Sequence, residues 1–199
     1  MNNTDFTQNE NNKKPSKLAL GAFDVFESFV RAAVVVLIVM TFFFKICVVE
    51  GASMNKTLYE GEKLIVQSFA YTPKENDIIV FHQTGRMLNE PVVKRVIATG
   101  DKWVRIDYDS KTVYVSDDNI FNYSDIVDDS DNVYLSFGKY EMSGVYEVYV
   151  PEGYLFVMGD NRNDSTDSRS SIIGLVDERR VIGKVILRFT PLHRFGSVE

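Results

Sequence analysis

The feature that most constrains this chain is an uncharged apolar run, Ala32 to Phe44, with Arg31 before it and Lys45 after it. As a helix, these residues span about 20 Å, which is short of the roughly 30 Å hydrocarbon core of a bilayer. Extending the run to residues 29–49 makes it long enough to cross the core, provided that both flanking cations snorkel to the interfaces. We therefore predict one N-terminal transmembrane helix over residues 29–49.

Three other interpretations of this segment stay open. A buried core helix is disfavoured, because the run is apolar on all sides rather than along one stripe. The run also has the length of a signal-peptide core, and Val49-Glu50-Gly51 forms a small-x-small cleavage pattern, but it begins later than a usual signal peptide. An interfacial amphipathic helix over residues 18–29 is the third interpretation, since Asp24 and Glu27 interrupt its apolar residues.

The distribution of positive charge predicts the orientation of the span. Three lysines and Arg31 precede it, whereas two lysines follow it closely beyond the bordering Lys45. By the positive-inside rule, we expect residues 1–28 on the cytoplasmic side and residues 50–199 on the opposite side.

After the anchor, the periodicity changes to that of β-strands, with β-branched and aromatic runs between turn signals. The predicted strands cover residues 63–67, 77–82, 92–98, 102–107, 111–116, 133–137, 145–150, 154–158 and 183–190. Residues 116–132 are acidic and predict a surface loop, and a short helix is expected near residues 165–171. The fold class is thus mainly β: an antiparallel β-sheet or barrel-like domain, with residues 107–150 as a candidate inserted β lobe.

Charge and cysteine content exclude several classes of protein. The formal net charge is −6 and the pI is near 5.0, which argues against a general nucleic-acid binder. The single cysteine, Cys47, excludes an intrachain disulfide and any zinc site built from cysteines.

Two residues with complementary chemistry follow the anchor. Ser53 lies just beyond the apolar span, and Lys94 follows amid β-branched apolar residues. A serine becomes a nucleophile when a neighbouring base takes its proton, and a lysine can act as that base once burial lowers its pKa. In a strand, Lys94 shares a face with Val92 and Val96, and Arg95 points to the other face. The alternative is that Lys94 and Arg95 are ordinary surface charges on an edge strand.

A polar cluster, Gly159 to Arg169, directly follows a predicted apolar strand. Its Asp and Arg residues can tie the loop together by bidentate pairing, and a serine within it can hold a lysine amine. A solvated loop is the simpler interpretation. A calcium loop is a further option, but the carboxylate spacing departs from the EF-hand pattern.

Three motifs in order resemble those of the bacterial type I signal peptidases (leader peptidases), of the small single-anchor kind of Gram-positive organisms. Ser53 to Leu58 (SMNKTL) matches the nucleophile motif apart from one position, and Lys94 to Asp101 (KRVIATGD) matches the lysine motif. Gly159 to Arg169 (GDNRNDSTDSR) matches the third motif in full. The resemblance covers about residues 29–196 and implies that residues 50–199 form a serine-lysine peptidase domain.

The resemblance also implies roles for individual residues. Ser53 would be the nucleophile, Lys94 the general base, and Ser165 would orient the lysine amine. The residues that would brace the site by ion pairs are Asp160, Arg95, Asp167 and Arg169. The residues that would line shallow pockets for small substrate side chains are Val49, Met54, Leu58, Val92 and Val93. No metal or cofactor is implied.

The substrates implied by the resemblance are the signal peptides of exported preproteins, and the other implied partner is the lipid bilayer, with no nucleic acid. The implied location is the bacterial cell membrane, single-pass, with a cytoplasmic N-terminus and an extracytoplasmic catalytic domain. Two residues depart from the family pattern. Lys56 stands where the family usually has proline, and Gly51 stands where some members have a serine that completes the oxyanion hole.

Other mechanisms and functions compete with this interpretation. A Ser-His-Asp triad would need His82 or His193, but His82 follows an apolar run as a strand-end or surface residue, and His193 lies near the C-terminus. A self-cleaving repressor-type peptidase would need a DNA-binding helix-turn-helix in place of the anchor. A catalytically inactive anchored β domain that binds exported peptides is the alternative from a different class.

Overall fold

The computed structural model describes residues 17–82, 90–128, 136–137, 140–141 and 143–198. The chain divides into two compact units, residues 1–41 and residues 42–199.

The described part of the first unit belongs to a single helix, α1 (Lys17–Phe43). Its segment Phe23–Phe43 is long and apolar enough to cross a membrane, and its large apolar side chains are exposed. The helix includes residues 18–29, for which a separate interfacial helix was the alternative interpretation, and it ends earlier than the predicted residue 49. The predicted helical span over residues 29–49 is therefore wrong at its C-terminal end, because residues 44–48 pair as a β-strand.

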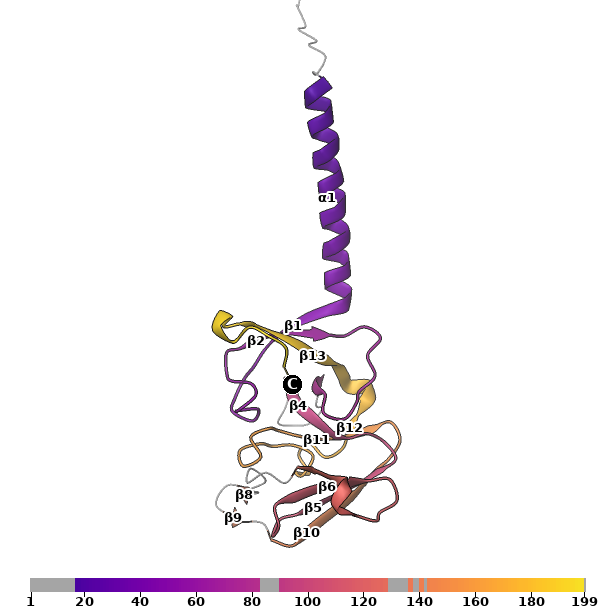
Figure 1. Cartoon of the computed structure of the whole chain (residues 1–199), viewed down its shortest axis with the longest axis vertical. Coiled ribbons are helices and arrows are strands. Elements are labelled where there is room, and N and C mark those ends of the chain that lie inside the picture. The colour runs from indigo at the N-terminus through magenta and orange to yellow at the C-terminus, as the bar shows by residue number, and fades with distance from the viewer. Residues whose placement is uncertain (1–16, 83–89, 129–135, 138–139, 142, 199) are drawn as a thin grey trace, which may run out of the picture. The chain divides into compact units, whose positions relative to one another are not determined.

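The second unit is built around a seven-stranded sheet in which every neighbouring pair of strands is antiparallel (Figure 1). In spatial order, its strands are β1 (Phe44–Val48), β2 (Lys63–Gln67), β13 (Val181–Thr190), β3 (Ile78–His82), β4 (Pro91–Ala98), β11 (Tyr154–Met158) and β12 (Val176–Asp177).

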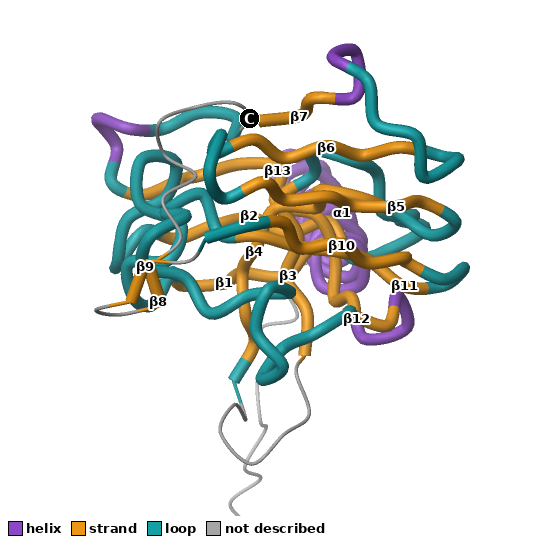
Figure 2. Tube along the Cα trace, turned by 90° about the horizontal axis from the view of Figure 1, so that it is seen from below, coloured by secondary structure: helices purple, strands orange, loops and turns teal. Residues whose placement is uncertain are grey.

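A four-stranded antiparallel sheet is built from residues 102–150, and Figure 2 shows its strands side by side. Its order is β10 (Val145–Val150), β5 (Lys102–Asp107), β6 (Thr112–Ser116) and β7 (Ile126–Asp128). The remaining short elements are β8 (Ser136–Phe137), β9 (Tyr140–Glu141) and the 3-10 turns η1 (Tyr123–Asp125), η2 (Glu178–Arg180) and η3 (Leu192–Arg194).

The predicted mainly antiparallel β class is confirmed, but two local predictions are wrong. The segment expected to be an acidic loop contains η1 and β7, because residues 126–128 pair with β6. No helix forms over residues 165–171, where the chain makes turns instead. The predicted strand over residues 133–137 is described only from Ser136, and its other residues lie outside the described part of the chain.

At strand β3, the sheet is buried on both of its faces. Its four apolar residues, Ile78 to Phe81, are all buried, which is the continuous apolar pattern of a two-sided strand. Ile78 and Val80 belong to one core cluster, and Ile79 and Phe81 belong to another. Strand β4, which carries Lys94 and Arg95, pairs with β3 and is therefore anchored to a strand that is buried on both faces.

Candidate active site

The loop between β1 and β2 contains the segment Ser53–Leu58, which we call the nucleophile loop. The backbone N–H groups of Thr57 and Leu58 both donate to the Met54 carbonyl, at 3.1 and 2.8 Å. Lys56 has a φ angle of 90°, in the region that non-glycine residues rarely adopt. A proline holds φ near −65°, so this loop has a geometry that the proline of the family motif cannot adopt.

Strand β4 carries Lys94 to this loop. The lysine Nζ lies 2.6 Å from the Ser53 Oγ, within hydrogen-bond distance. As the strand alternation predicts, Val92 and Val96 pack in one shared cluster on one face of β4. Lys94 is only 3% exposed, and this burial lowers its pKa from 10.5 to about 8. The nearby charges have smaller effects: Asp167 and Asp160 raise the pKa, and Arg169 lowers it.

On the other face of β4, Arg95 forms a bidentate pair with Asp160. The arginine Nε and Nη2 each lie 2.8 Å from one carboxylate oxygen. The Thr57 hydroxyl donates to the same carboxylate at 2.5 Å. Burial alone would raise the pKa of Asp160, but the hydrogen bonds from Arg95 and Thr57 lower it below the usual range. The carboxylate therefore links β4 to the nucleophile loop as an anion.

A second pair, Asp167 with Arg169, is completely buried. The Arg169 Nε and Nη2 each lie 2.7 Å from a carboxylate oxygen, and the Gly159 N–H donates to that carboxylate at 3.0 Å. The pKa of Asp167 would rise through burial, but these hydrogen bonds lower it. Gly159 must be a glycine, because a Cβ there would lie 2.2 Å from the Ser165 Oγ and 2.4 Å from the Ser53 carbonyl oxygen.

Asn161 fixes the start of the nucleophile loop. Its backbone N–H donates to the Ser53 carbonyl, and its side-chain amide donates to the Ala52 carbonyl, both at 3.0 Å. The next residue, Arg162, pairs with Asp128 at the end of β7 and donates to the Gly159 carbonyl at 3.0 Å. The Gly159–Arg169 cluster is thus a tied loop that contacts the serine, rather than a solvated one.

A cleft of about 680 Å³ opens at the Ser53–Lys94 pair. It is lined by residues 46–54, 90–94 and 162–166 together with Arg169 and Ile173.

The residues predicted to line substrate pockets fall into two groups. Val49, Met54, Val92 and Val93 line the cleft. Leu58 does not: it is completely buried in the core beneath the nucleophile loop, beside Met54. The prediction that Leu58 lines a substrate pocket is therefore corrected: its side chain packs in the core.

Ser165 also lines the cleft, but its expected contact with the lysine amine is not among the hydrogen bonds of the described residues. Its Oγ is buried and has no partner of normal hydrogen-bond geometry among them. The hydroxyl is still close enough to Asp167 to contribute to the lowered pKa of that carboxylate.

Neither histidine lines the cleft. His82 is the exposed last residue of β3, and His193 lies exposed on η3. The predicted strand-end or surface position of His82 is confirmed.

Comparisons with known proteins identify the family of this chain. Residues 22–190 match the family model described as "Signal peptidase, peptidase S26". Signal peptidase IB of Staphylococcus aureus (strain Mu50) is 33% identical over 183 residues, covering 82% of this chain and 87% of that protein. Signal peptidase I of Bacillus licheniformis is 33% identical over 189 residues, covering 89% of this chain and 93% of that protein.

A crystal structure of a signal peptidase I from Enterococcus faecalis V583 aligns with 57% of this chain and 97% of its own, at 25% identity and a TM-score of 0.36. On the sequence matches, the chain belongs to the signal peptidase family, peptidase S26. Membership of this family supports a peptidase that removes signal peptides. The alternative of an inactive peptide-binding domain is not favoured.

Proposed function

We propose that this chain is a membrane-bound serine endopeptidase that removes N-terminal signal peptides from exported preproteins after small residues, with Ser53 as nucleophile and Lys94 as general base. The observation that carries the proposal is the 2.6 Å separation of the two reactive atoms in a site where burial lowers the lysine pKa to about 8. A neutral amine at that distance can accept the hydroxyl proton.

The reaction would proceed through an acyl-enzyme. As the Ser53 Oγ bonds to the scissile carbonyl carbon, its proton passes to the Lys94 Nζ. The resulting ammonium then protonates the leaving nitrogen as the C–N bond breaks, which releases the mature protein. Water then attacks the serine ester and loses a proton to the regenerated amine. As the ester C–O bond breaks, the Lys94 ammonium returns a proton to the Ser53 Oγ, and the signal peptide leaves with a new carboxyl group that ionises in solution. The Ser53 backbone N–H would stabilise the oxyanion in both steps.

The surrounding residues support this chemistry as positioning groups. Asp160 joins the polar loop to β4 through Arg95 and to the nucleophile loop through Thr57, and Asp167 with Arg169 braces the polar loop itself. Ser165 would orient the amine when a substrate is bound. Preference for small side chains is supported by four apolar residues on the cleft wall, Val49, Met54, Val92 and Val93.

The experiment that tests the peptidase activity is cleavage of a model preprotein by the full-length chain in detergent, with mass spectrometry of both products. We expect one cut after a small residue, and no cut with Ser53→Ala. Ser124→Ala, which changes an exposed serine of η1, is the matched control and should cleave normally. Full activity of Ser53→Ala would refute the proposed nucleophile.

The membrane part of the proposal is that α1 anchors the chain with its N-terminus in the cytoplasm and its catalytic domain outside. It is supported by the apolar segment Phe23–Phe43 and by the cluster of Lys13, Lys14 and Lys17 that precedes it. In a Cys47→Ser background, a membrane-impermeant maleimide should label Ser124→Cys in intact cells and Thr4→Cys only after lysis. The reverse labelling pattern would refute the orientation.

A further inference from the structure

Three charged residues that the mechanism does not use converge behind the nucleophile loop: Glu62, Arg188 and Arg194. We propose that this group, the C-terminal clamp, is a positioning device that holds the nucleophile loop in its reactive geometry through the carbonyl of Thr57. The inference rests on the proposed function, because it assigns the clamp to the serine of that same site.

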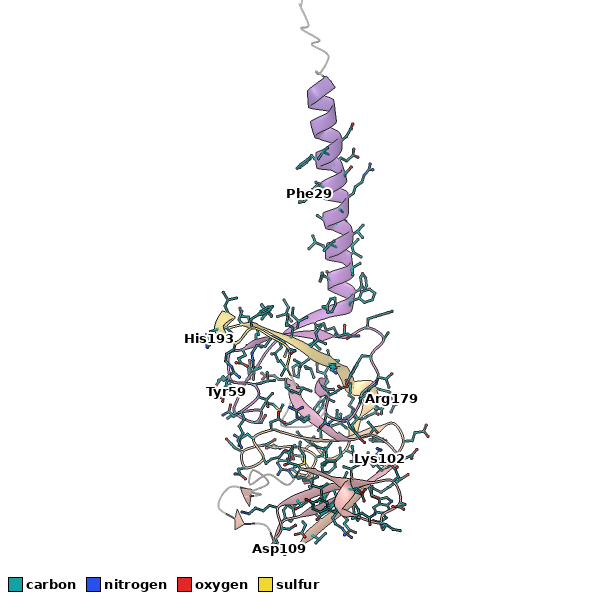
Figure 3. The ribbon with its side chains drawn as sticks, viewed as in Figure 1. Phe29, Tyr59, Lys102, Asp109, Arg179 and His193 are labelled. Atoms are coloured by element: carbon teal, nitrogen blue, oxygen red, sulfur yellow. The ribbon has the colours of Figure 1, made fainter. Side chains whose placement is uncertain are left out.

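The topology of the sheet brings the three residues together. Glu62 directly precedes β2, and Arg188 lies on β13, opposite Leu64 of β2 in the antiparallel register. Arg194 ends η3, which follows β13, and in Figure 3 the neighbouring His193 lies on the same side of the unit as Tyr59. The Arg194 guanidinium stacks on the Tyr59 ring at 4.4 Å.

Glu62 is the centre of the clamp and is only 3% exposed. One of its carboxylate oxygens lies 2.6 Å from the Arg194 Nη1. The other accepts from the Tyr59 backbone N–H at 3.1 Å and lies 3.5 Å from the Arg188 Nη1. A buried carboxylate that is paired at both of its oxygens is held in one position, because removing any partner leaves polar atoms unsatisfied.

The two arginines connect Glu62 to the nucleophile loop. The Arg188 Nη1 and the Arg194 Nη2 donate to the same atom, the Thr57 carbonyl oxygen, at 2.9 and 3.2 Å. The Arg188 Nε also donates to the Arg194 carbonyl at 2.6 Å, which ties the two arginines together. Two cations face one carboxylate here, and the carbonyls of Thr57 and Arg194 accept further N–H groups of the two guanidinium groups.

Thr57 is thereby held at all of its polar groups. Its hydroxyl donates to Asp160 and its N–H donates to the Met54 carbonyl, in addition to the two bonds at its carbonyl. The preceding residue, Lys56, has a φ of 90° that its own preferences disfavour. Such a conformation persists when the surrounding structure determines it, and the clamp supplies contacts that do so four residues after Ser53.

The clamp acts on position rather than on the basicity of Lys94. The charges that shift the Lys94 pKa are Asp167, Arg169 and Asp160, and none of them belongs to the clamp. Loss of the clamp should therefore lower kcat while the pH profile keeps its midpoint. Disturbance of the lysine pocket would instead move that midpoint.

The test compares Arg194→Ala with Arg179→Ala in the full-length chain. Arg179 is a matched control, since its side chain is 87% exposed and pairs with Asp177 before β13. We expect Arg194→Ala to lower kcat about 10- to 100-fold, as misplacement of a reacting group does. Its KM should stay within about threefold of wild type, and the pH midpoint should not change. Hydrogen exchange in peptides covering residues 53–58 should become faster, and Arg179→Ala should change none of these quantities.

If Arg194→Ala fails to fold, Arg194→Lys replaces it, because an ammonium keeps the charge for Glu62 but lacks the fork that reaches both acceptors. A folded Arg194 variant with wild-type kcat and wild-type exchange over residues 53–58 would overturn the proposal. So would an equal loss in Arg179→Ala, or a shifted pH midpoint. Full activity of Ser53→Ala would instead refute the proposed function, and the exchange measurement would still report on the clamp.

Discussion

Raising the pH across the lysine pKa is the perturbation that tests the general base most quantitatively. Burial lowers the pKa of Lys94 from 10.5 to about 8. From pH 7 to pH 9, the neutral fraction of such a lysine rises from about 9% to about 91%. The rate constant kcat/KM should therefore increase about tenfold over this range and level off above it. A lysine with an ordinary pKa would give an increase of about a hundredfold that is still rising at pH 9.

The assay is kcat/KM for a fluorogenic peptide containing a signal-peptide cleavage site, measured from pH 6.5 to pH 10 at constant ionic strength. Circular dichroism at each pH confirms that the chain stays folded. Lys102→Ala is the control, because Lys102 pairs with Glu75 on the surface and its pKa is raised rather than lowered. A hundredfold rise without a plateau would refute the burial argument, and a midpoint near 6.5 would indicate a histidine base.

Three further predictions concern stability and the nucleophile loop. Lys94→Met should abolish cleavage, yet it should raise the free energy of unfolding at pH 7 by up to about 3 kcal/mol because it removes a buried amine. Between pH 8 and 10.5 the lysine binds more protons in the unfolded state than in the folded state. Denaturant titrations of both proteins should therefore show that the gain in stability shrinks as the pH rises through this window. Asp167→Asn leaves Arg169 buried without its counter-ion and should cost roughly 3–5 kcal/mol in urea unfolding. Glu147→Gln, which removes the counter-ion of the more exposed Arg105, should cost little, and equal costs would refute the argument. Lys56→Gly should raise the free energy of unfolding by about 1 kcal/mol, because glycine adopts the φ of 90° without strain. Lys56→Pro should lower kcat, because proline cannot adopt this φ. A Lys56→Pro variant with wild-type kcat would contradict the argument that the loop needs this backbone angle.

The strands were predictable because their residues carry a local signal. The β-branched and aromatic runs between turn signals predicted the bounds of β2, β5, β10 and β11 to the residue. The end of α1 was missed, since Phe44–Val48 is apolar enough to continue a membrane helix and becomes a strand only by pairing with β2. Composition cannot report such a tertiary partner.

The sequence predicted that the polar loop after β11 belongs to the site, but it did not predict the conformation of this loop. Polar residues near Ser165 are compatible with a helix, yet the buried Asp167 accepts from Gly159 and Arg169 in a turn geometry that satisfies its charge. Local hydrogen bonding of this kind competes with helix formation and leaves little periodic signal.

The proximity of Ser53 and Lys94 could be inferred only from the resemblance of the motifs. Residues 41 positions apart carry no local signal that they meet. The same limit explains why sequence reasoning missed Asn161 and the three clamp residues. Arg194 contacts the Thr57 carbonyl across 137 positions of the chain, through an antiparallel register that periodicity cannot specify.

The most direct test of the central claim is cleavage of a model preprotein by wild type, Ser53→Ala, Lys94→Ala and His82→Ala under identical conditions. The Ser53–Lys94 mechanism predicts that the first two variants lose cleavage while remaining folded. His82→Ala should cleave like wild type, because His82 is exposed at the end of β3. Cleavage by Lys94→Ala at the wild-type rate, together with loss in His82→Ala, would contradict the lysine base.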